Sequence, residues 1–110
     1  MISYEDFEKI DIRGGTIVAV DEFPEAKKPA YKLTIDFGGG IGVKRSSAQI
    51  TELYTREELI GKQVIGVVNF PPKRIGPFIP EVLTLGLPDK EGRVVLLVPT
   101  YDVPNGVKMF

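Results

Sequence analysis

The chain has 110 residues, carries a formal net charge of −1, and contains neither cysteine nor histidine. This length fits one compact domain. The missing cysteines exclude disulfides and thiolate nucleophiles, and the missing histidines remove the commonest general base and metal ligand. Because the chain holds 12 Gly and 9 Pro, it turns often, which favours short strands over long helices. These counts predict a small binding domain that is not an enzyme and uses no metal or cofactor.

The charge is unevenly distributed along the chain. Residues 1–26 hold seven acidic and two basic residues, whereas residues 27–80 hold nine basic and four acidic ones, a local net charge of +5. An anionic partner is therefore expected on the middle segment. The acidic start of the chain does not suit a signal peptide, and no apolar run approaches the ~20 residues of a membrane span. We therefore expect a cytoplasmic protein with no membrane insertion.

In chain order, the local patterns predict two short helices and six strands. The order is a helix over residues 3–10, strands at Thr16–Val20, Tyr31–Phe37 and Ile41–Arg45, a helix over residues 55–61, and strands at Gln63–Phe70, Val82–Leu87 and Val94–Val98. Both helices begin with a capping pattern, Ser3 with Asp6 and Thr55 with Glu58. Three glycines at 38–40 predict the tight turn before the third strand, because glycine adopts the positive φ that such turns require.

This order of elements predicts an all-β domain, a five-stranded OB-fold Greek-key barrel with short helices at the N-terminus and between strands 3 and 4. Residues 94–98 are expected to form an edge or closing strand. Closing the sheet also protects the edges of short, glycine-rich strands. The loops that flank the binding face of such a barrel correspond here to residues 21–30 and 71–81.

The second of these loops has an unusual composition. Residues 69–80 contain four prolines, two adjacent cations and four large apolar residues. Proline stiffness lowers the entropy cost of ordering, so such a segment presents apolar anchors to a partner with little loss on binding. The pattern favours a polypeptide-binding groove, and the alternative is that the same side chains pack beneath the loop as core. The four large apolar residues proposed to line this groove are Phe70, Ile75, Phe78 and Ile79.

Four cations and one amide near the same loop predict contacts to phosphates and base edges, as in nucleic-acid recognition: Lys44, Arg45, Asn69, Lys73 and Arg74. The alternative is a solvated charged rim, because the chain is acidic overall. Ser46 and Ser47 beside Lys44 also fit a serine–lysine nucleophile. No oxyanion-hole pattern or third orienting group accompanies them, so hydroxyls that satisfy backbone groups are the better interpretation.

The end of the sequence predicts a self-association surface. Val107, Met109 and Phe110 follow a Pro-Asn-Gly turn. Large apolar residues at a chain end need burial, and a symmetric partner provides it. Asp11 and Arg13 lie two residues apart on an extended segment, which suits either a local ion pair or a dimer contact.

Blocks of sequence spread over essentially the whole chain carry a family resemblance. They include Asp11-Ile12-Arg13, Ile35-Asp36-Phe37-Gly38, Ser46-Ser47-Ala48-Gln49-Ile50-Thr51, Asn69-Phe70-Pro71-Pro72, Ile75-Gly76-Pro77-Phe78 and Val103-Pro104-Asn105-Gly106. In these blocks the chain resembles the CsaA-type export-related chaperones, small homodimeric relatives of the tRNA-binding domain of bacterial methionyl-tRNA synthetase. It departs from them at Pro80, where relatives carry serine, and at Gly14, where valine or threonine is common.

The resemblance implies a single tRNA-binding-type OB-fold domain over residues 1–110 that dimerises through N- and C-terminal extensions. It also implies an ATP-independent, export-related molecular chaperone that binds unfolded preproteins through a hydrophobic cleft. The alternative function is a structure-specific tRNA-binding module. The expected partners are a second copy of the chain and unfolded or export-bound polypeptide, with tRNA as the ligand of the alternative. No cofactor is expected.

Overall fold

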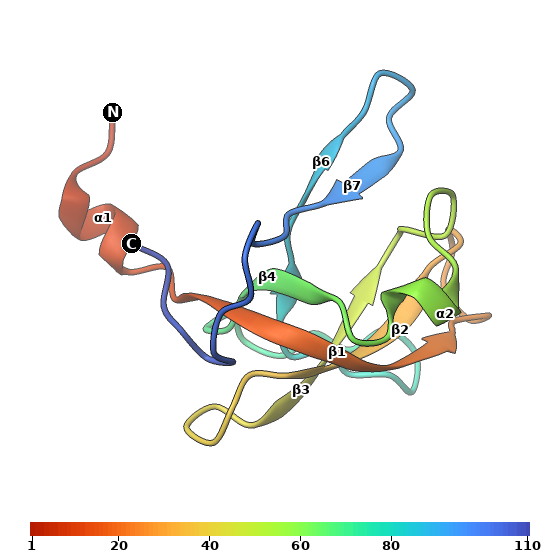
Figure 1. The fold of residues 1–110 in the computed structure, drawn as a ribbon. Coiled ribbons are helices and arrows are strands. Elements are labelled where there is room, and N and C mark those ends of the chain that lie inside the picture. Colours follow the sequence, from red (N-terminus) through yellow and green to blue (C-terminus); the bar gives the residue numbers. More distant parts are fainter.

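A computed structural model describes residues 1–110, and its main feature is a five-stranded antiparallel barrel (Figure 1). The elements in chain order are α1 (Tyr4–Glu8), β1 (Ile12–Glu22), β2 (Tyr31–Asp36), β3 (Val43–Ala48), α2 (Arg56–Leu59), β4 (Gln63–Val67), β5 (Leu83–Thr84), β6 (Gly86–Pro88) and β7 (Val94–Leu96). The strand order in the barrel sheet is β3-β2-β1-β4-β5. The predicted all-β barrel, with one helix before it and one between strands 3 and 4, is confirmed.

The last strands differ from the prediction. The strand expected over residues 82–87 is divided into β5 and β6, and β7 pairs with β6 instead of closing the barrel. The two form a hairpin that projects from the barrel (Figure 1). Gly86 lets the two strands of this hairpin approach closely, because a Cβ there would lie 2.9 Å from the carbonyl oxygen of Val95. Any other residue would force the two strands of the hairpin apart.

The first strand is longer than the predicted Thr16–Val20 and serves two neighbours. Its first half pairs with β4 and its second half with β2, and the two halves overlap at Thr16. Gly15 lies at this crossing, where a Cβ would be 2.8 Å from both Ile35 Cγ2 and Phe37 Cδ1. The glycine therefore lets β1 approach the core side chains of β2 closely.

Both helices begin with the capping boxes that the sequence predicts. The Ser3 hydroxyl accepts a hydrogen bond from the Asp6 backbone N–H at 3.1 Å, and the Thr55 hydroxyl accepts one from the Glu58 N–H at 3.2 Å. These contacts satisfy N–H groups that a helix leaves free at its first turn. With five and four residues, both helices are too short to cross a membrane.

The core fills the barrel and has a small satellite. The main cluster of buried side chains comprises Ile17, Val20, Tyr31, Leu33, Ile35, Phe37, Ile50, Leu59, Val64, Val82 and Leu96. A second cluster holds Phe23, Ala30 and Phe78, which come from the two loops that flank the binding face. Ser46 is the one polar residue with a buried position, and its hydroxyl accepts a hydrogen bond from Thr84 Oγ1 at 2.8 Å.

Candidate functional site

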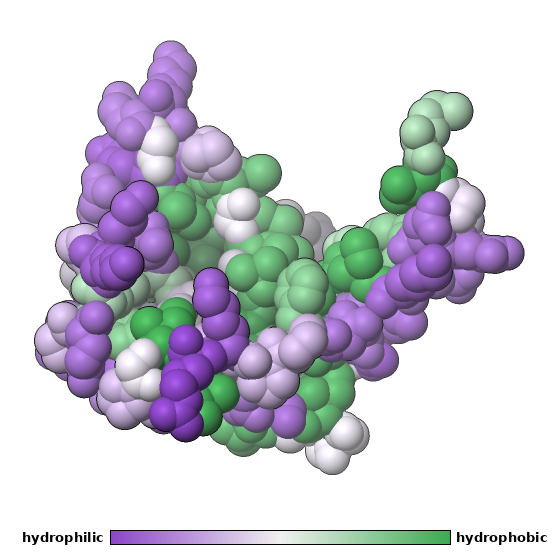
Figure 2. Space-filling view, turned by 180° about the vertical axis from the view of Figure 1, so that it is seen from behind, coloured by the Kyte–Doolittle hydropathy of each residue, from purple (hydrophilic) through white to green (hydrophobic).

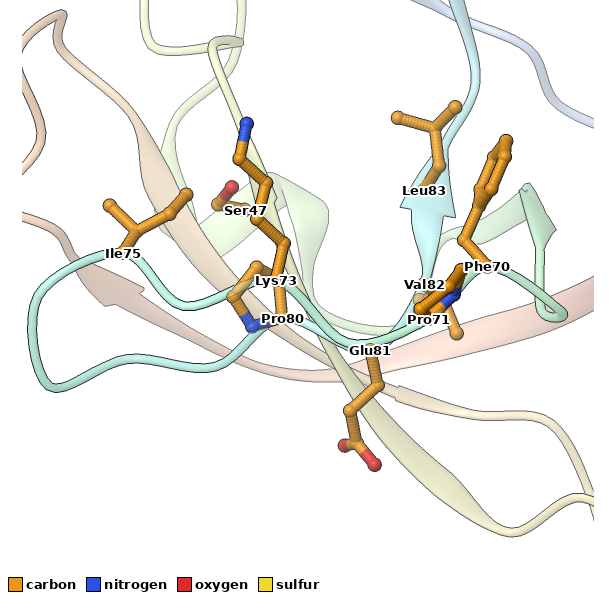
Figure 3. Close-up of a pocket in the computed structure, with 9 residues that line it drawn as sticks. All are labelled: Ser47, Phe70, Pro71, Lys73, Ile75, Pro80, Glu81, Val82 and Leu83. Carbon is orange, nitrogen blue, oxygen red and sulfur yellow. The ribbon is translucent and has the colours of Figure 1, made fainter.

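A hollow of about 380 Å³ lies between the proline-rich loop and β5. We call it the loop cleft; its lining residues are Ser47, Phe70, Pro71, Lys73, Ile75, Pro80, Glu81, Val82 and Leu83. Figure 3 shows Phe70 and Leu83 on one side and Lys73 and Ile75 on the other, while the Glu81 carboxylate points away from them. The arrangement is a short, open groove with apolar walls and one ammonium group at its mouth.

The cleft keeps large apolar side chains in contact with solvent. Phe70 is 54% exposed and Leu83 is 47% exposed, whereas Val82 beneath them is buried. Seen from behind, the molecule is hollowed, and hydrophobic side chains line the hollow between projecting hydrophilic parts (Figure 2). An apolar surface that a folded domain leaves open in a concave place is typical of a binding site.

The predicted anchors are divided between different places. Phe70 and Ile75 line the loop cleft, as expected for a polypeptide-binding groove. Phe78 is instead only 4% exposed and packs in the satellite core, which is the core alternative raised from the sequence. Ile75, from the same loop, is partly buried and packs against this satellite core as well. Ile79 is 42% exposed and lies in a different hollow on the far side of Phe78.

This other hollow, of about 320 Å³, is a cationic shelf formed by Lys32, Arg45, Pro77, Phe78 and Ile79. The Lys32 Nζ lies 5.5 Å from the Phe78 ring centroid, and the Arg45 guanidinium carbon lies 4.6 Å from it. Neither cation takes part in an ion pair. Cations held over aromatic faces at the edge of an open hollow suit phosphate groups and stacked bases.

The other residues predicted to contact nucleic acid have separate roles. Lys44 lies 3.6 Å from Glu81 Oε2, so its charge is paired. Asn69 holds the N-terminal segment, because its side chain accepts a hydrogen bond from the Asp11 N–H and donates one to the Lys9 carbonyl. Lys73 lines the loop cleft, and Arg74, the fifth of the set, is exposed on the same loop. The predicted set is therefore not one surface.

Glu81 fixes the start of β5 against β3. Its carboxylate accepts a hydrogen bond from the Arg45 N–H at 3.2 Å, and its own N–H donates to the Arg45 carbonyl at 2.8 Å. With the Lys44 ion pair, these contacts make Glu81 a structural residue. Ser46 faces the core and bonds to Thr84, and no hydrogen bond joins Lys44 to either serine. The serine–lysine nucleophile is not formed.

The residues predicted for dimer contact lie where the chain's two ends meet. Asp11 and Arg13 form a local ion pair of 2.6 Å, and the Arg13 guanidinium also donates to the Gly106 carbonyl at 3.0 Å. The tail runs along β1, with Met109 N–H donating to the Ile12 carbonyl at 2.8 Å. Asp11 and Arg13 thus act within the subunit, where they hold the C-terminal segment.

This arrangement creates a terminal arm, made of α1, which projects from the barrel, and residues 107–110, which run along the start of β1 and end beside α1 (Figure 1). A hollow of about 210 Å³ between them is lined by Tyr4, Phe7, Glu8, Ile10, Lys108, Met109 and Phe110. Val107 is 39% exposed, Met109 41% and Phe110 fully exposed. The arm therefore presents a second apolar surface, separate from the loop cleft.

Sequence reasoning missed two residues that matter in these sites. The prediction of a strand over residues 82–87 gives Leu83 no role, although alternation with buried Val82 places it on the outer face. The alternating pattern over residues 31–37 predicts Lys32 only as a polar position of a strand. Its place above Phe23 and Phe78 depends on contact between two loops distant in sequence, which no local pattern reveals.

The chain matches known proteins over nearly its full length. Residues 12–108 match the family described as "Putative tRNA binding domain". The chaperone CsaA from Bacillus anthracis is 52% identical, with a TM-score of 0.93, and the match covers 100% of this chain and 99% of that one. The CsaA chaperone protein from Picrophilus torridus is 57% identical, with a TM-score of 0.93 and 100% of both chains covered.

Part of a much larger enzyme also matches. The methionine–tRNA ligase of Flavobacterium johnsoniae is 35% identical over 96% of this chain, and the match covers 14% of the ligase. The fold and its open surfaces define an OB-type binding module. The chain belongs to the tRNA-binding domain family, as a CsaA-type member.

Proposed function

We propose that the protein is a molecular chaperone that binds apolar stretches of unfolded or export-bound polypeptide in the loop cleft. The observation that carries this proposal is the pair of exposed side chains, Phe70 and Leu83, held over Val82 in a cleft whose far wall is a proline-rich loop. A preformed apolar cleft binds with little loss of its own entropy. The two structurally similar CsaA chaperones, from Bacillus anthracis and Picrophilus torridus, support the same function.

Binding and release on this account need no ATP and no catalysis. The glycines at 38–42 form the turn between β2 and β3, where the Gly42 N–H donates to the Gly38 carbonyl at 2.6 Å. A phosphate-binding glycine loop would instead lead from a strand into a helix. An extended client segment exchanges by mass action, in the cytoplasm, as long as its apolar side chains remain exposed.

The active form that we propose is a homodimer built through the terminal arm. Met109 and Phe110 project from the arm, and Tyr4 on α1 is 68% exposed beside them. A second copy is the partner that buries this surface by symmetry. Two loop clefts in one particle would hold one client chain at two points, which raises its apparent affinity.

A structure-specific tRNA-binding module is the second candidate, because the cationic shelf is a distinct observation in its favour. Lys32 and Arg45 carry unpaired charges over aromatic rings, and the family model is named for tRNA binding. Pro80 lies in the wall of the loop cleft, not in the shelf. Its replacement of the family's serine therefore leaves the shelf intact.

The proposal is tested with two variants that replace equally exposed apolar side chains in different places. Phe70 is 54% exposed in the cleft, and Ile60 is 55% exposed after α2. Fluorescence anisotropy of a labelled, unfolded polypeptide should show about tenfold weaker binding to Phe70→Ser and unchanged binding to Ile60→Ser. Equal affinities of both variants and the unaltered protein for the polypeptide would show that the loop cleft does not bind it.

A further inference from the structure

The barrel is not closed by hydrogen bonds along the whole length of β3 and β5. These two strands lie at opposite ends of the sheet order and do not pair as strands. At one end of their junction the Arg45 carbonyl accepts hydrogen bonds from the N–H groups of Glu81 and Val82, at 2.8 and 3.3 Å. Further along, only side chains meet, through the Ser46 and Thr84 hydroxyls. The edge of β3 is therefore open beyond Arg45.

The open edge exposes a specific pair of backbone groups. In an antiparallel pair, successive residues point their N–H and C=O groups alternately toward and away from the neighbouring strand. Arg45 points both groups away from β2, since its N–H donates to Glu81 and its C=O accepts from the β5 side. Ser47, two residues on, therefore points its N–H and C=O in the same direction.

These groups of Ser47 have no backbone partner. The Ser47 N–H takes part in no hydrogen bond outside the β2–β3 ladder, from which it points away. The Ser47 carbonyl has one long contact of 3.5 Å, from the hydroxyl of Ser46. Backbone groups at a sheet edge are strong hydrogen-bonding sites. A free donor, and an acceptor whose one contact is this long hydroxyl bond, thus lie on one residue of the edge strand.

Ser47 is also part of the lining of the loop cleft. It is half-buried there, and Figure 3 shows its side chain beside Lys73 and Ile75, across the cleft from Phe70 and Leu83. An extended polypeptide needs main-chain partners in addition to pockets for its alternate side chains. The cleft offers the apolar walls, and the β3 edge at Ser47 offers the main-chain partners.

We propose that a bound client segment adds to the barrel as a short extra strand, pairing its main chain with the N–H and C=O of Ser47. This inference rests on the proposed chaperone function and names the way in which the client is held. Alternate client side chains then reach Phe70 and Leu83, while the intervening ones face solvent. Because every polypeptide has the same main chain, such pairing suits a protein that binds unfolded chains of different sequence.

The first test is made on the client. A labelled apolar peptide of about ten residues that binds the protein is resynthesised with one N-methyl group at each position in turn, and anisotropy gives each affinity. Removal of a paired N–H should weaken binding roughly fivefold to tenfold. Because Ser47 offers a single acceptor, one client N–H is paired, and the loss should be confined to one position of the peptide. Equal affinity of all the methylated peptides overturns the proposal.

The second test is made on Ser47 itself. Ser47→Pro removes the free N–H without breaking a ladder bond to β2, whereas Ser47→Ala keeps the N–H and removes only the hydroxyl. We expect a loss of roughly fivefold to tenfold with proline and less than twofold with alanine, with urea unfolding confirming that both variants fold. Equal binding by folded proline and alanine variants overturns the pairing, and if the proline variant does not fold, the peptide scan decides.

The outcomes separate this inference from the proposed function. If Phe70→Ser weakens binding but neither the peptide scan nor Ser47→Pro does, the cleft binds client side chains alone, and the strand pairing is wrong. If the unmodified peptide does not bind at all, the chaperone proposal fails and the pairing fails with it. A loss confined to one position of the scan, together with weaker binding to Ser47→Pro, supports both.

Discussion

The rings of Phe23 and Phe78 pack edge to face, with their centroids 5.1 Å apart and their planes at 70°. Phe23 belongs to the loop after β1, and Phe78 belongs to the loop before β5. Each ring is almost fully buried, so the contact fastens the two loops that flank the binding face. The proline-rich loop is thus held at its tip by a small core of its own, which leaves its other face free to form the loop cleft.

Phe78→Ala should destabilise the fold strongly. Removing a buried phenylalanine from a packed site costs about 3–5 kcal/mol, because burial is lost and a cavity remains. Urea unfolding of this variant should show a loss in that range. Phe70→Ala, at an exposed ring, should change the free energy of unfolding by less than about 1 kcal/mol. A Phe78→Ala variant with normal stability and weakened polypeptide binding would show that Phe78 binds polypeptide and is not a core residue.

Gly38→Ala should loosen the C-terminal turn. Gly38 has a φ of 85°, and a Cβ there would lie 2.6 Å from the Asn105 carbonyl oxygen. The left-handed backbone alone costs a residue with a side chain about 1–2 kcal/mol. Gly39→Ala is the matched control, because nothing lies within 4 Å of its Cβ position. Thermal unfolding should separate the two, and equal melting temperatures would contradict the packing of this turn on residue 105.

Charge on the terminal arm should disrupt the proposed dimer. A double variant, Met109→Glu with Phe110→Glu, keeps the Met109 backbone bond to β1 but places two carboxylates on the apolar surface. Light scattering should then report a monomer, as it should after deletion of Val107–Phe110. Val18→Glu, on an exposed part of β1, should leave the dimer intact. A double variant with the mass of the unaltered protein would exclude the arm from the interface.

The cationic shelf should govern any binding of tRNA. Each neutralised phosphate adds about one to the slope of log affinity against log salt. Lys32→Ala with Arg45→Ala should therefore lower that slope by about two, while Lys90→Ala in the β6–β7 hairpin should leave it unchanged. Polypeptide binding should be insensitive to the shelf variants. If the shelf variants did not change the slope of log affinity against log salt, tRNA would bind at a surface other than the cationic shelf.

The tip of the β6–β7 hairpin should weaken in acid. Partial desolvation raises the pKa of Asp89, but hydrogen bonds from the backbone N–H and guanidinium of Arg93 and from the Glu91 N–H outweigh it and hold the pKa below the usual 3.8. The stabilisation is therefore complete above pH 3.8 and is lost as the pH falls through the lower folded pKa. The Gly92 amide resonance should report this change, and Asp89→Asn should abolish it. If the Gly92 resonance of the Asp89→Asn variant changed with pH as in the unaltered protein, a group other than Asp89 would be responsible for the change.

The sequence predicts those parts of the molecule that depend on local patterns. The capping boxes at Ser3 and Thr55 and the alternation of β2 each have a cause within a few residues. The position of β7 does not, because it depends on how closely Gly86 approaches Val95. Phe78 shows the same limit in the site. From the sequence, an apolar residue in a loop is predicted to be an exposed anchor, because the sequence does not show which other loop covers it.

The account rests on capture of unfolded polypeptide by the apolar loop cleft, and one titration tests this most directly. A labelled, denatured export precursor is titrated with the protein in anisotropy, with and without excess bulk tRNA, at low and high salt. Apolar burial persists at high salt, whereas phosphate contacts weaken. We predict saturable precursor binding that survives both high salt and tRNA. A precursor that never binds, while tRNA binds with a steep salt dependence, would contradict the chaperone function and leave the tRNA-binding module in its place.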